Sequence, residues 1–201
     1  MPLRRDDVIE AALALLDEGG LDGLTTRRLA DRLGVQVGAL YWHVRDKREL
    51  LVCLAERIIG EVAPTRSESG DWAEQLSGGA HALRAAMLRH RDGARIVAAY
   101  GAECERSLRL SEEGLHVLRS WGIPLAAAAH VGDAVMSYVT GFVLQEQTMP
   151  APPGVDRLTG FPLLAEWTVT RPAASRDEAF AAGVELLVTG IRETFFDGER
   201  E

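Results

Sequence analysis

The sequence is poor in the residues that mark several common protein classes. Its two cysteines, Cys53 and Cys104, lie far apart and form no CxxC pattern. This argues against a disulfide framework and a thiolate zinc site, and it suits a reducing compartment. Strand-like alternation is scarce. The longest uncharged stretches, near 121–129 and 134–145, fall short of the roughly 20 apolar residues of a membrane span.

Secretion and catalytic signals are also missing. Asp6, Asp7 and Glu10 interrupt the apolar segment that a signal peptide would need. There is no nucleophile elbow, Walker loop, dinucleotide fingerprint or HExxH pattern. We therefore expect a soluble, cytoplasmic protein that is not an enzyme and has no cofactor, metal site or membrane partner. Turnover of a bound ligand would revive the enzyme hypothesis.

The charge is unevenly distributed along the chain. The net charge is −8, which by itself argues against a nucleic-acid partner. Between Gly23 and Arg48, however, six cations stand against two anions. Because local charge sets a phosphate-binding footprint, this window is a candidate contact surface for nucleic acid.

Helical periodicity dominates, so we predict an all-α fold. Capping residues and glycine or proline stops give the boundaries. Five prolines break the chain between about 149 and 176, and a connection of this length is functional or disordered. The expected helices cover about 5–18, 26–33, 37–43, 46–62, 71–90, 93–100, 105–120, 124–147 and 175–196.

The short helices at 26–33 and 37–43 have the spacing of a helix-turn-helix. Gly34 supplies the sharp turn between them. A plain helical hairpin in a core has the same outline. The adjacent rings of Tyr41, Trp42 and His43 favour the first interpretation, because no single helix face can bury all three. Cations flank the motif on both sides, which points the same way.

The stretch "GLDGLTTRRLADRLGVQVGALYWHVRDKRELL", residues 20–51, resembles the DNA-binding domain of the TetR family of bacterial repressors. Within that family, "LTTRRLA", "LYWHV" and "DKRELL" are most similar to the tetracycline-repressor branch. The resemblance implies a helix-turn-helix domain at 1–47, followed by an effector-binding and dimerisation domain at 48–201. It also implies a homodimer that binds double-stranded operator DNA and a small-molecule effector.

The resemblance assigns roles to single residues of the motif. Arg27 matches a guanine-reading position, which suits a bidentate Arg–guanine contact. Trp42 matches a position near the DNA backbone. Where the related branch reads bases with Gln-Pro-Thr, this chain has Val37, Gly38 and Ala39, so a different operator is expected. The positions that match phosphate contacts are Thr26, Tyr41, His43 and Lys47.

The resemblance also indicates what the effector site lacks. In the tetracycline-repressor branch, a histidine after an RDGA(K/R)V motif helps to hold magnesium–tetracycline, and Val97 stands there in this chain. Two other drug-contacting positions are Ala63 and Gly79, and Gln145 occupies the acidic metal-site position. We therefore predict a metal-independent, more apolar pocket for a bulky aromatic or polyketide-like effector. Its predicted lining is Leu83, Met87, Val97, Tyr100, Leu115, Gly132, Asp133 and Met136.

Two helices near the C-terminus are candidates for dimerisation. The helix at 124–147 is apolar nearly all round, and its small residues permit close helix contact. Together with the last helix it could form a four-helix interface with a second copy, although packing within one subunit is the alternative. The predicted interface residues are Gly141, Phe180, Val184, Leu187, Val188 and Ile191.

These observations predict a ligand-responsive repressor of transcription. An activator remains open, because the same binding residues serve both functions. A small-molecule sensor that acts only through a protein partner is the other alternative, and salt-dependent binding to a palindrome would exclude it.

Overall fold

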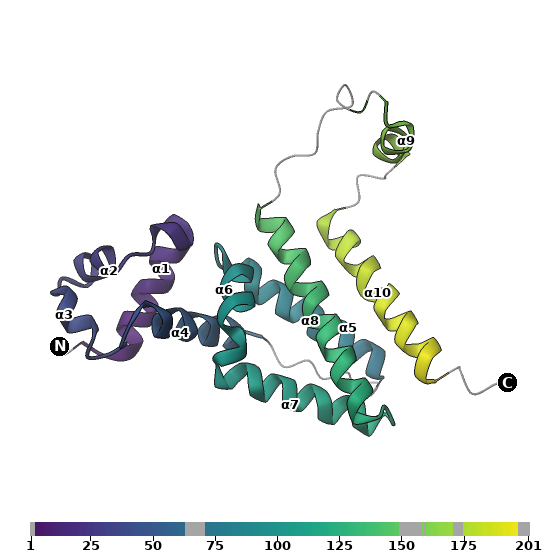
Figure 1. Cartoon of the computed structure of the whole chain (residues 1–201), viewed down its shortest axis with the longest axis horizontal. Helices are drawn as coiled ribbons and strands as arrows, with labels where there is room; N and C mark the ends of the chain where they lie inside the picture. The colour runs from purple at the N-terminus through teal and green to yellow at the C-terminus, as the bar shows by residue number, and fades with distance from the viewer. Residues whose placement is uncertain (1–2, 63–70, 149–157, 159, 171–174, 197–201) are drawn as a thin grey trace. The chain divides into compact units, whose positions relative to one another are not determined.

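The computed structural model describes residues 3–62, 71–148, 158, 160–170 and 175–196, and these residues are helical, without strands. The all-α prediction is confirmed. The chain forms two compact units, Met1–Gln147 and Thr148–Glu201 (Figure 1). The proposed boundary at 47–48 does not coincide with this division. The helix that begins at Lys47 packs against helices on both sides of that boundary.

The first unit begins with three helices, α1 (Arg5–Gly23), α2 (Thr26–Leu33) and α3 (Val37–Leu40). We call these helices and the loop that follows them, residues 5–46, the head. The glycine pair predicted to end the first helix kinks it instead, because Gly20 takes a φ of 67° and one more turn follows. Gly34 adopts a left-handed φ of 66° and turns the chain from α2 toward α3.

A small apolar core holds the head together. The helix periodicity of α1 turns Val8, Ala12 and Leu16 inward, as the sequence pattern predicts. Leu29 of α2 and Leu40 of α3 are also buried, so each short helix is anchored by at least one leucine. The second helix of the motif ends at Leu40, and Tyr41–His43 form a turn rather than the predicted last helical turn.

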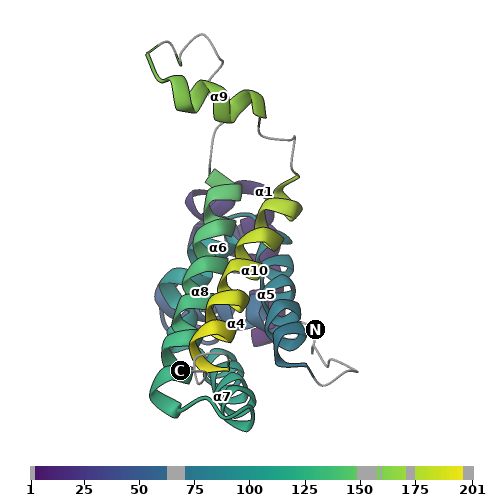
Figure 2. The ribbon, with the colours of Figure 1, turned by 90° about the vertical axis from the view of Figure 1, so that its right-hand side faces the viewer.

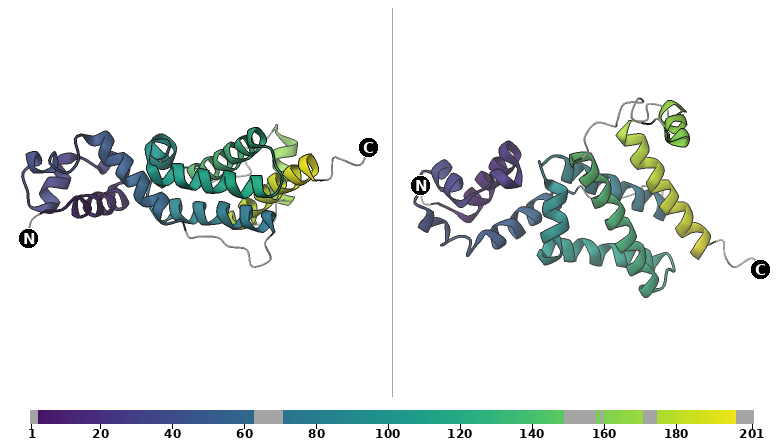
Figure 3. Two further views of the ribbon diagram at one scale, coloured as in Figure 1. Left: turned by 90° about the horizontal axis from the view of Figure 1, so that it is seen from below. Right: turned by 45° about the horizontal axis from the view of Figure 1, so that its top comes forward.

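Helix α4 (Lys47–Gly60) connects the head to the rest of the unit. Asp46 caps it by accepting a hydrogen bond from the Glu49 N–H at 2.8 Å. The Glu49 carboxylate reaches back to the N–H of Arg45 rather than to Asp46. The buried face of α4 contacts α1, α5, α6 and α7, so one helix supports both parts of the unit (Figure 3). That face comprises Leu50, Leu51, Leu54, Ala55, Ile58 and Ile59.

Four more helices complete the first unit. They are α5 (Trp72–Leu88), α6 (Gly93–Tyr100), α7 (Glu105–Ser120) and α8 (Leu125–Thr148), with a 3-10 turn at Gly101–Glu103 after α6. The short turn from α5 to α6 requires Gly93, because a Cβ atom there would lie 2.3 Å from the Met87 carbonyl oxygen. A buried ion pair between Arg84 and Glu146 joins α5 to α8 through two hydrogen bonds of 2.7–2.8 Å.

Helix α8 is longer and more continuously apolar than the uncharged stretches in the sequence suggested. By length and composition alone it could cross a membrane. This is weak support for a membrane span, because core helices of soluble proteins have the same composition. Only 28% of its most apolar window is buried. Its exposed side is formed mainly by small residues, namely Ala126, Ala129, His130, Gly132, Asp133, Ala134 and Ser137.

The second unit contains α9 (Pro162–Thr170) and α10 (Arg176–Phe195) (Figure 2). Helix α9 was not predicted, because its surroundings are rich in proline. Pro162 itself is compatible with a first helical turn, where its missing N–H has no partner to lose. The predicted capping box at the start of α10 is confirmed, since Ser175 and Glu178 each accept the other's backbone N–H.

The N-cap of α2 provides a stability test of the head. The Thr25 hydroxyl accepts a hydrogen bond from the Arg28 N–H at 3.2 Å. Thr25→Ala should lower the free energy of unfolding by about 1 kcal/mol, because that N–H loses its partner. Urea unfolding measures the change. Thr25→Ser, which keeps the oxygen, is the matched control, and an equal loss in both variants would contradict the capping role.

Candidate nucleic-acid interface and ligand site

The motif formed by α2 and α3 presents its rings outward. Trp42 is 88% exposed and Tyr41 is 52% exposed, whereas His43 is half-buried. Leu40 and Val44, on either side of these rings, are buried and fix the turn against the head. A large apolar ring in solvent is unfavourable, so a rigidly supported turn with two exposed rings is typical of a contact surface.

The residues predicted to read bases are all at least partly accessible to solvent. Val37 and Gly38 are exposed and Ala39 is half-buried, all on α3. Thr26 is half-buried in the first turn of α2, and Arg27 beside it is exposed. The surface therefore carries few side chains that can donate or accept hydrogen bonds to bases, and Arg27 is the most capable of them.

The six cations of the basic window divide into two groups. Four of them are held by neighbouring groups of the protein, whereas Arg27 and Lys47 are exposed and form no ion pair within the described part of the chain. An unpaired cation can neutralise a phosphate without first breaking an internal contact. The four held contacts are Arg28 to the Gly23 carbonyl, Arg32 to Glu18, Arg45 to Glu49 and Arg48 to Glu103.

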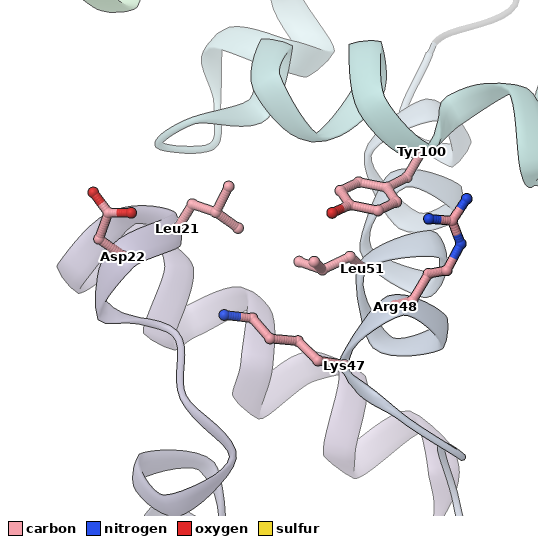
Figure 4. A pocket seen from close by; sticks show the side chains of 6 residues that line it. All are labelled: Leu21, Asp22, Lys47, Arg48, Leu51 and Tyr100. Carbon is pink, nitrogen blue, oxygen red and sulfur yellow. The ribbon is translucent and has the colours of Figure 1, made fainter.

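Lys47 lies at the N-terminus of α4, where the helix dipole adds to its charge. It borders an open cavity of about 500 Å³ between α1, α4 and α6 (Figure 4). Across this cavity the Arg48 guanidinium lies 5.9 Å from the centre of the Tyr100 ring and also pairs with Glu103. Of these two neighbouring cations, only Lys47 is available for an external anion.

The residues predicted to line the effector pocket are not brought together around one cavity. Leu83, Met87 and Val97 are buried in the core of the first unit. Gly132 and Asp133 lie on the exposed side of α8, away from any interior position. The half-buried members are Tyr100, Leu115 and Met136, and of all eight residues only Tyr100 borders either of the two cavities described, at the cavity beside Lys47.

The carboxylate beside the metal-site position, which Gln145 occupies, is already engaged. Glu146 receives two hydrogen bonds from Arg84, whose guanidinium also lies 5.8 Å from the centre of the Phe142 ring. Within the described residues, no three His, Cys, Asp or Glu side chains form a group that could hold a metal ion. Val97 and Gly79 offer no metal ligand, and Ala63 lies outside the described residues.

Most residues predicted for a dimer interface are buried within a single chain. Phe180, Val184, Val188 and Ile191 of α10 are buried, and Leu187 is half-buried. Gly141 of α8 is half-buried. The exposed face of α10 consists instead of Ala181, Ala182, Glu185, Leu186, Thr189, Gly190, Arg192 and Glu193.

The sequence analysis missed a polar cluster where the head meets the α5–α6 turn. His90, in that turn, is buried and contacts carboxylates from α1 and from the end of α4. A histidine at the end of a predicted helix gave no signal, because its partners are 73 and 29 residues away in sequence.

Comparisons with known proteins match nearly the whole chain. The model of bacterial regulatory proteins of the tetR family matches residues 8–53, and the model of the tetracyclin repressor-like C-terminal domain matches residues 63–195. The chain belongs to the TetR family. The class A tetracycline repressor of transposon 1721 from Escherichia coli is 37% identical over 196 residues, which cover 94% of this chain and 90% of that protein.

Solved structures agree with this assignment. A possible TetR family regulator from Streptomyces coelicolor has a TM-score of 0.86 and 35% identity, covering 94% of this chain and 99% of the other. ActR from the same organism, in complex with actinorhodin, has a TM-score of 0.84 and 31% identity, covering 96% and 99%. BioQ with its double-stranded DNA operator has a TM-score of 0.73 and 32% identity, covering 96% and 99%.

Membership fixes the broad biochemical class. TetR-family proteins are ligand-responsive transcriptional regulators that bind operator DNA as dimers, and they are not enzymes. The prediction of a helix-turn-helix regulator is confirmed. The individual DNA, effector and dimer contacts remain predictions.

The exposed ring of Trp42 allows surface and core roles to be separated. Trp42→Ala should change the free energy of unfolding by no more than about 0.5 kcal/mol, because the ring is 88% exposed. Leu40→Ala, two residues away and 2% exposed, should cost about 2–5 kcal/mol. Urea unfolding of both variants measures the difference. A loss above 2 kcal/mol for Trp42→Ala would show that the ring supports the fold.

Proposed function

We propose that this chain is a homodimeric transcriptional repressor that binds a palindromic operator and is released by a small, largely apolar or aromatic effector. The observation that carries the proposal is the surface of the helix-turn-helix. Buried leucines fix it from behind, two exposed rings project from it, and Arg27 and Lys47 remain unpaired.

The DNA contacts follow from the chemistry of this surface. Lys47, Tyr41, His43 and Thr26 hold phosphates, and Trp42 lies against the backbone. Arg27 donates two hydrogen bonds to a guanine edge. Val37 and Ala39 offer only apolar contacts, which suit thymine methyl groups. Most of the affinity therefore comes from backbone contacts and most of the discrimination from Arg27.

Dimerisation explains the exposed side of α8, which is rich in small residues. A face of alanine and glycine permits a second helix to approach closely, and a symmetric partner presents the same face. Pairing of this face with its copy buries it without a membrane, so we place the protein in the cytoplasm. The exposed small residues of α10, such as Ala181 and Ala182, contribute a second surface.

Release by the effector follows from thermodynamic linkage between effector binding and DNA binding. The effector must bind the DNA-incompetent state more tightly than the competent one. A difference of about 1–3 kcal/mol weakens DNA binding by roughly 5–150-fold. Helix α4 is the lever, because it contacts α1 of the head and α6 of the effector-binding part.

The effector binds without magnesium in this proposal. Val97 and Gly79 lack metal-binding atoms, and Arg84 neutralises Glu146. A relative, TetR from Acinetobacter baumannii AYE, has been solved in complex with minocycline, and ActR with actinorhodin. The apolar residues Leu83, Met87 and Val97 suit the aromatic part of such ligands, once their packing opens to admit one.

Single substitutions of the two unpaired cations test the DNA contacts. Arg27→Ala should reduce discrimination at one base pair of each half-site, and the free energy of binding to the operator should become less favourable by about 1–3 kcal/mol. Lys47→Ala should weaken all duplexes alike and lower the salt dependence of binding by about one charge per protomer. Fluorescence anisotropy on operator and mismatched duplexes measures both effects.

Arg32→Ala is the matched control, because it removes a cation that is already paired with Glu18. It should weaken binding less than Lys47→Ala does. If both substitutions at Arg27 and Lys47 leave operator binding unchanged, the proposed interface is wrong.

Minocycline with MgCl₂ tests the metal claim. Because no metal ligand set is present among the described residues, any minocycline binding measured by calorimetry should be the same with MgCl₂ and with EDTA. Binding that appears only with magnesium and is abolished by EDTA would contradict the proposal.

A further inference from the structure

The α5–α6 turn contacts the head through a histidine placed between two carboxylates. The Nδ1 atom of His90 lies 3.1 Å from a carboxylate oxygen of Asp17 in α1. Its Nε2 atom lies 3.1 Å from the carboxylate of Glu61, which directly follows α4. His90 is 7% exposed. We call these three side chains the latch.

Further contacts from the same turn fix the end of α1. The Asp92 carboxylate accepts the Leu21 N–H at 2.7 Å, and the Arg91 N–H donates to Asp17 at 3.2 Å. Glycine at residue 20 favours this close approach, since it adopts a φ of 67° there and has no Cβ atom. A Cβ there would lie 2.7 Å from the Asp92 carboxylate. The head is therefore held by its backbone as well as by side chains.

The latch is also tied to α8. The Gln147 amide donates to the carbonyl oxygens of His90, at 2.8 Å, and Met87, at 3.2 Å. Its oxygen accepts the Ala94 N–H at 3.1 Å. A shift at the end of α8 would thus move the turn that carries His90. The neighbouring Glu146 is fixed to α5 by Arg84.

The geometry requires a specific protonation state. A neutral imidazole has one N–H and one lone pair, so it can donate to only one of two carboxylates. The imidazolium donates to both. Burial raises the pKa of the Glu61 carboxyl, but hydrogen bonds from His90 and Arg89 outweigh this effect and leave its pKa below the usual value. The Glu61 carboxyl is therefore ionised in the range, about pH 5–8, in which histidine changes charge.

The other charged groups around the latch come from the α5–α6 turn, from α6 and from α1. Arg89 pairs with Glu61, and the Arg91 guanidinium donates to the Glu18 carbonyl. Burial raises the pKa of Asp92, but the Leu21 N–H and Arg95 bring it below the usual value. Asp22 and Arg95 line the open cavity beside His90, together with Asp92.

We propose that His90 is a proton-sensitive positioning residue, which in its charged form holds the head to the effector-binding part and in its neutral form releases it. This rests on the proposed function as a DNA-binding dimer. Protonation closes the latch, so we expect the head to be fixed at low pH and freed as the pH rises through the range, about pH 5–8, in which histidine side chains change charge. Freed heads adopt a range of separations within the dimer. A smaller fraction of dimers then matches the half-site spacing of the operator, and this weakens the apparent affinity for DNA.

The test compares operator binding by the full-length dimer between pH 6.0 and 8.5 at constant ionic strength. Wild type should bind about tenfold more weakly at pH 8.5, a change of about 1.4 kcal/mol. Because His43 is a second histidine, on the proposed DNA surface, every variant is measured both with His43 intact and in a His43→Gln background, and the effect of the latch is the pH dependence that persists in both. His90→Ala should bind weakly at both pH values, since it can make neither hydrogen bond.

Asp17→Asn distinguishes a proton switch from a purely structural contact. Its amide can donate to the lone pair of neutral His90, while its oxygen still accepts the Arg91 N–H. This variant should therefore bind at pH 8.5 about as tightly as wild type does at pH 6.0. Asp31→Asn, an exposed head carboxylate outside the latch, is the matched control and should keep the wild-type pH dependence.

The outcomes separate the two proposals. Loss of operator preference at pH 6.0 in wild type would refute the proposed function itself. If operator binding is intact at pH 6.0, but wild type and Asp17→Asn show the same pH dependence, the latch is wrong. Tighter binding by wild type at pH 8.5 than at pH 6.0 would also overturn it.

Discussion

Helix α4 is the constraint on which the rest of the first unit depends. Its buried face packs against α1 of the head and against α5, α6 and α7, so neither part can move without displacing it. Its N-terminus carries Lys47, the unpaired cation proposed to bind phosphate, and Glu61 of the latch directly follows its C-terminus. DNA contact and coupling to the effector-binding part therefore lie at opposite ends of one rigid element. This arrangement lets a small change near α6 alter where the head presents its helix-turn-helix.

An acidic protein can bind DNA here because some of its cations are paired within the chain and others are left for the DNA. Most cations of the basic window are engaged in contacts within the chain, through partners such as Glu18, Glu49 and Glu103. Because these cations are paired within the protein, they contribute little to the electrostatic potential outside it. Arg27 and Lys47 form no ion pair within the described residues, so in the proposed complex a few side chains determine the electrostatic part of binding. In the same proposal, Val37, Gly38 and Ala39 leave discrimination to Arg27 and to the shape of the DNA.

Local signals predicted the fold well, and long-range contacts escaped prediction. The limits of α2, α6 and α7 and the caps at Thr25 and Ser175 follow from short patterns, which act through neighbouring backbone atoms. The apolar side of α10 could be inferred from its periodicity, but what covers that side could not, because periodicity does not identify the partner of a helix face. The pocket residues were chosen on the same basis, and Gly132 and Asp133 proved exposed. Family membership could be predicted because the head motif is continuous in sequence. The latch joins positions 17, 61 and 90, and only the folded chain reveals it.

The most direct test of the central claim is selection of bound duplexes from a random pool, followed by sequencing of those that the full-length protein enriches. The account predicts two half-sites in inverted symmetry, with centres about one helical turn apart or slightly more, because each protomer of a dimer presents one recognition helix. A guanine within each half-site should lose its enrichment when Arg27 is replaced by alanine. Absence of any enriched sequence, or enrichment of a single unsymmetrical site, would contradict the account.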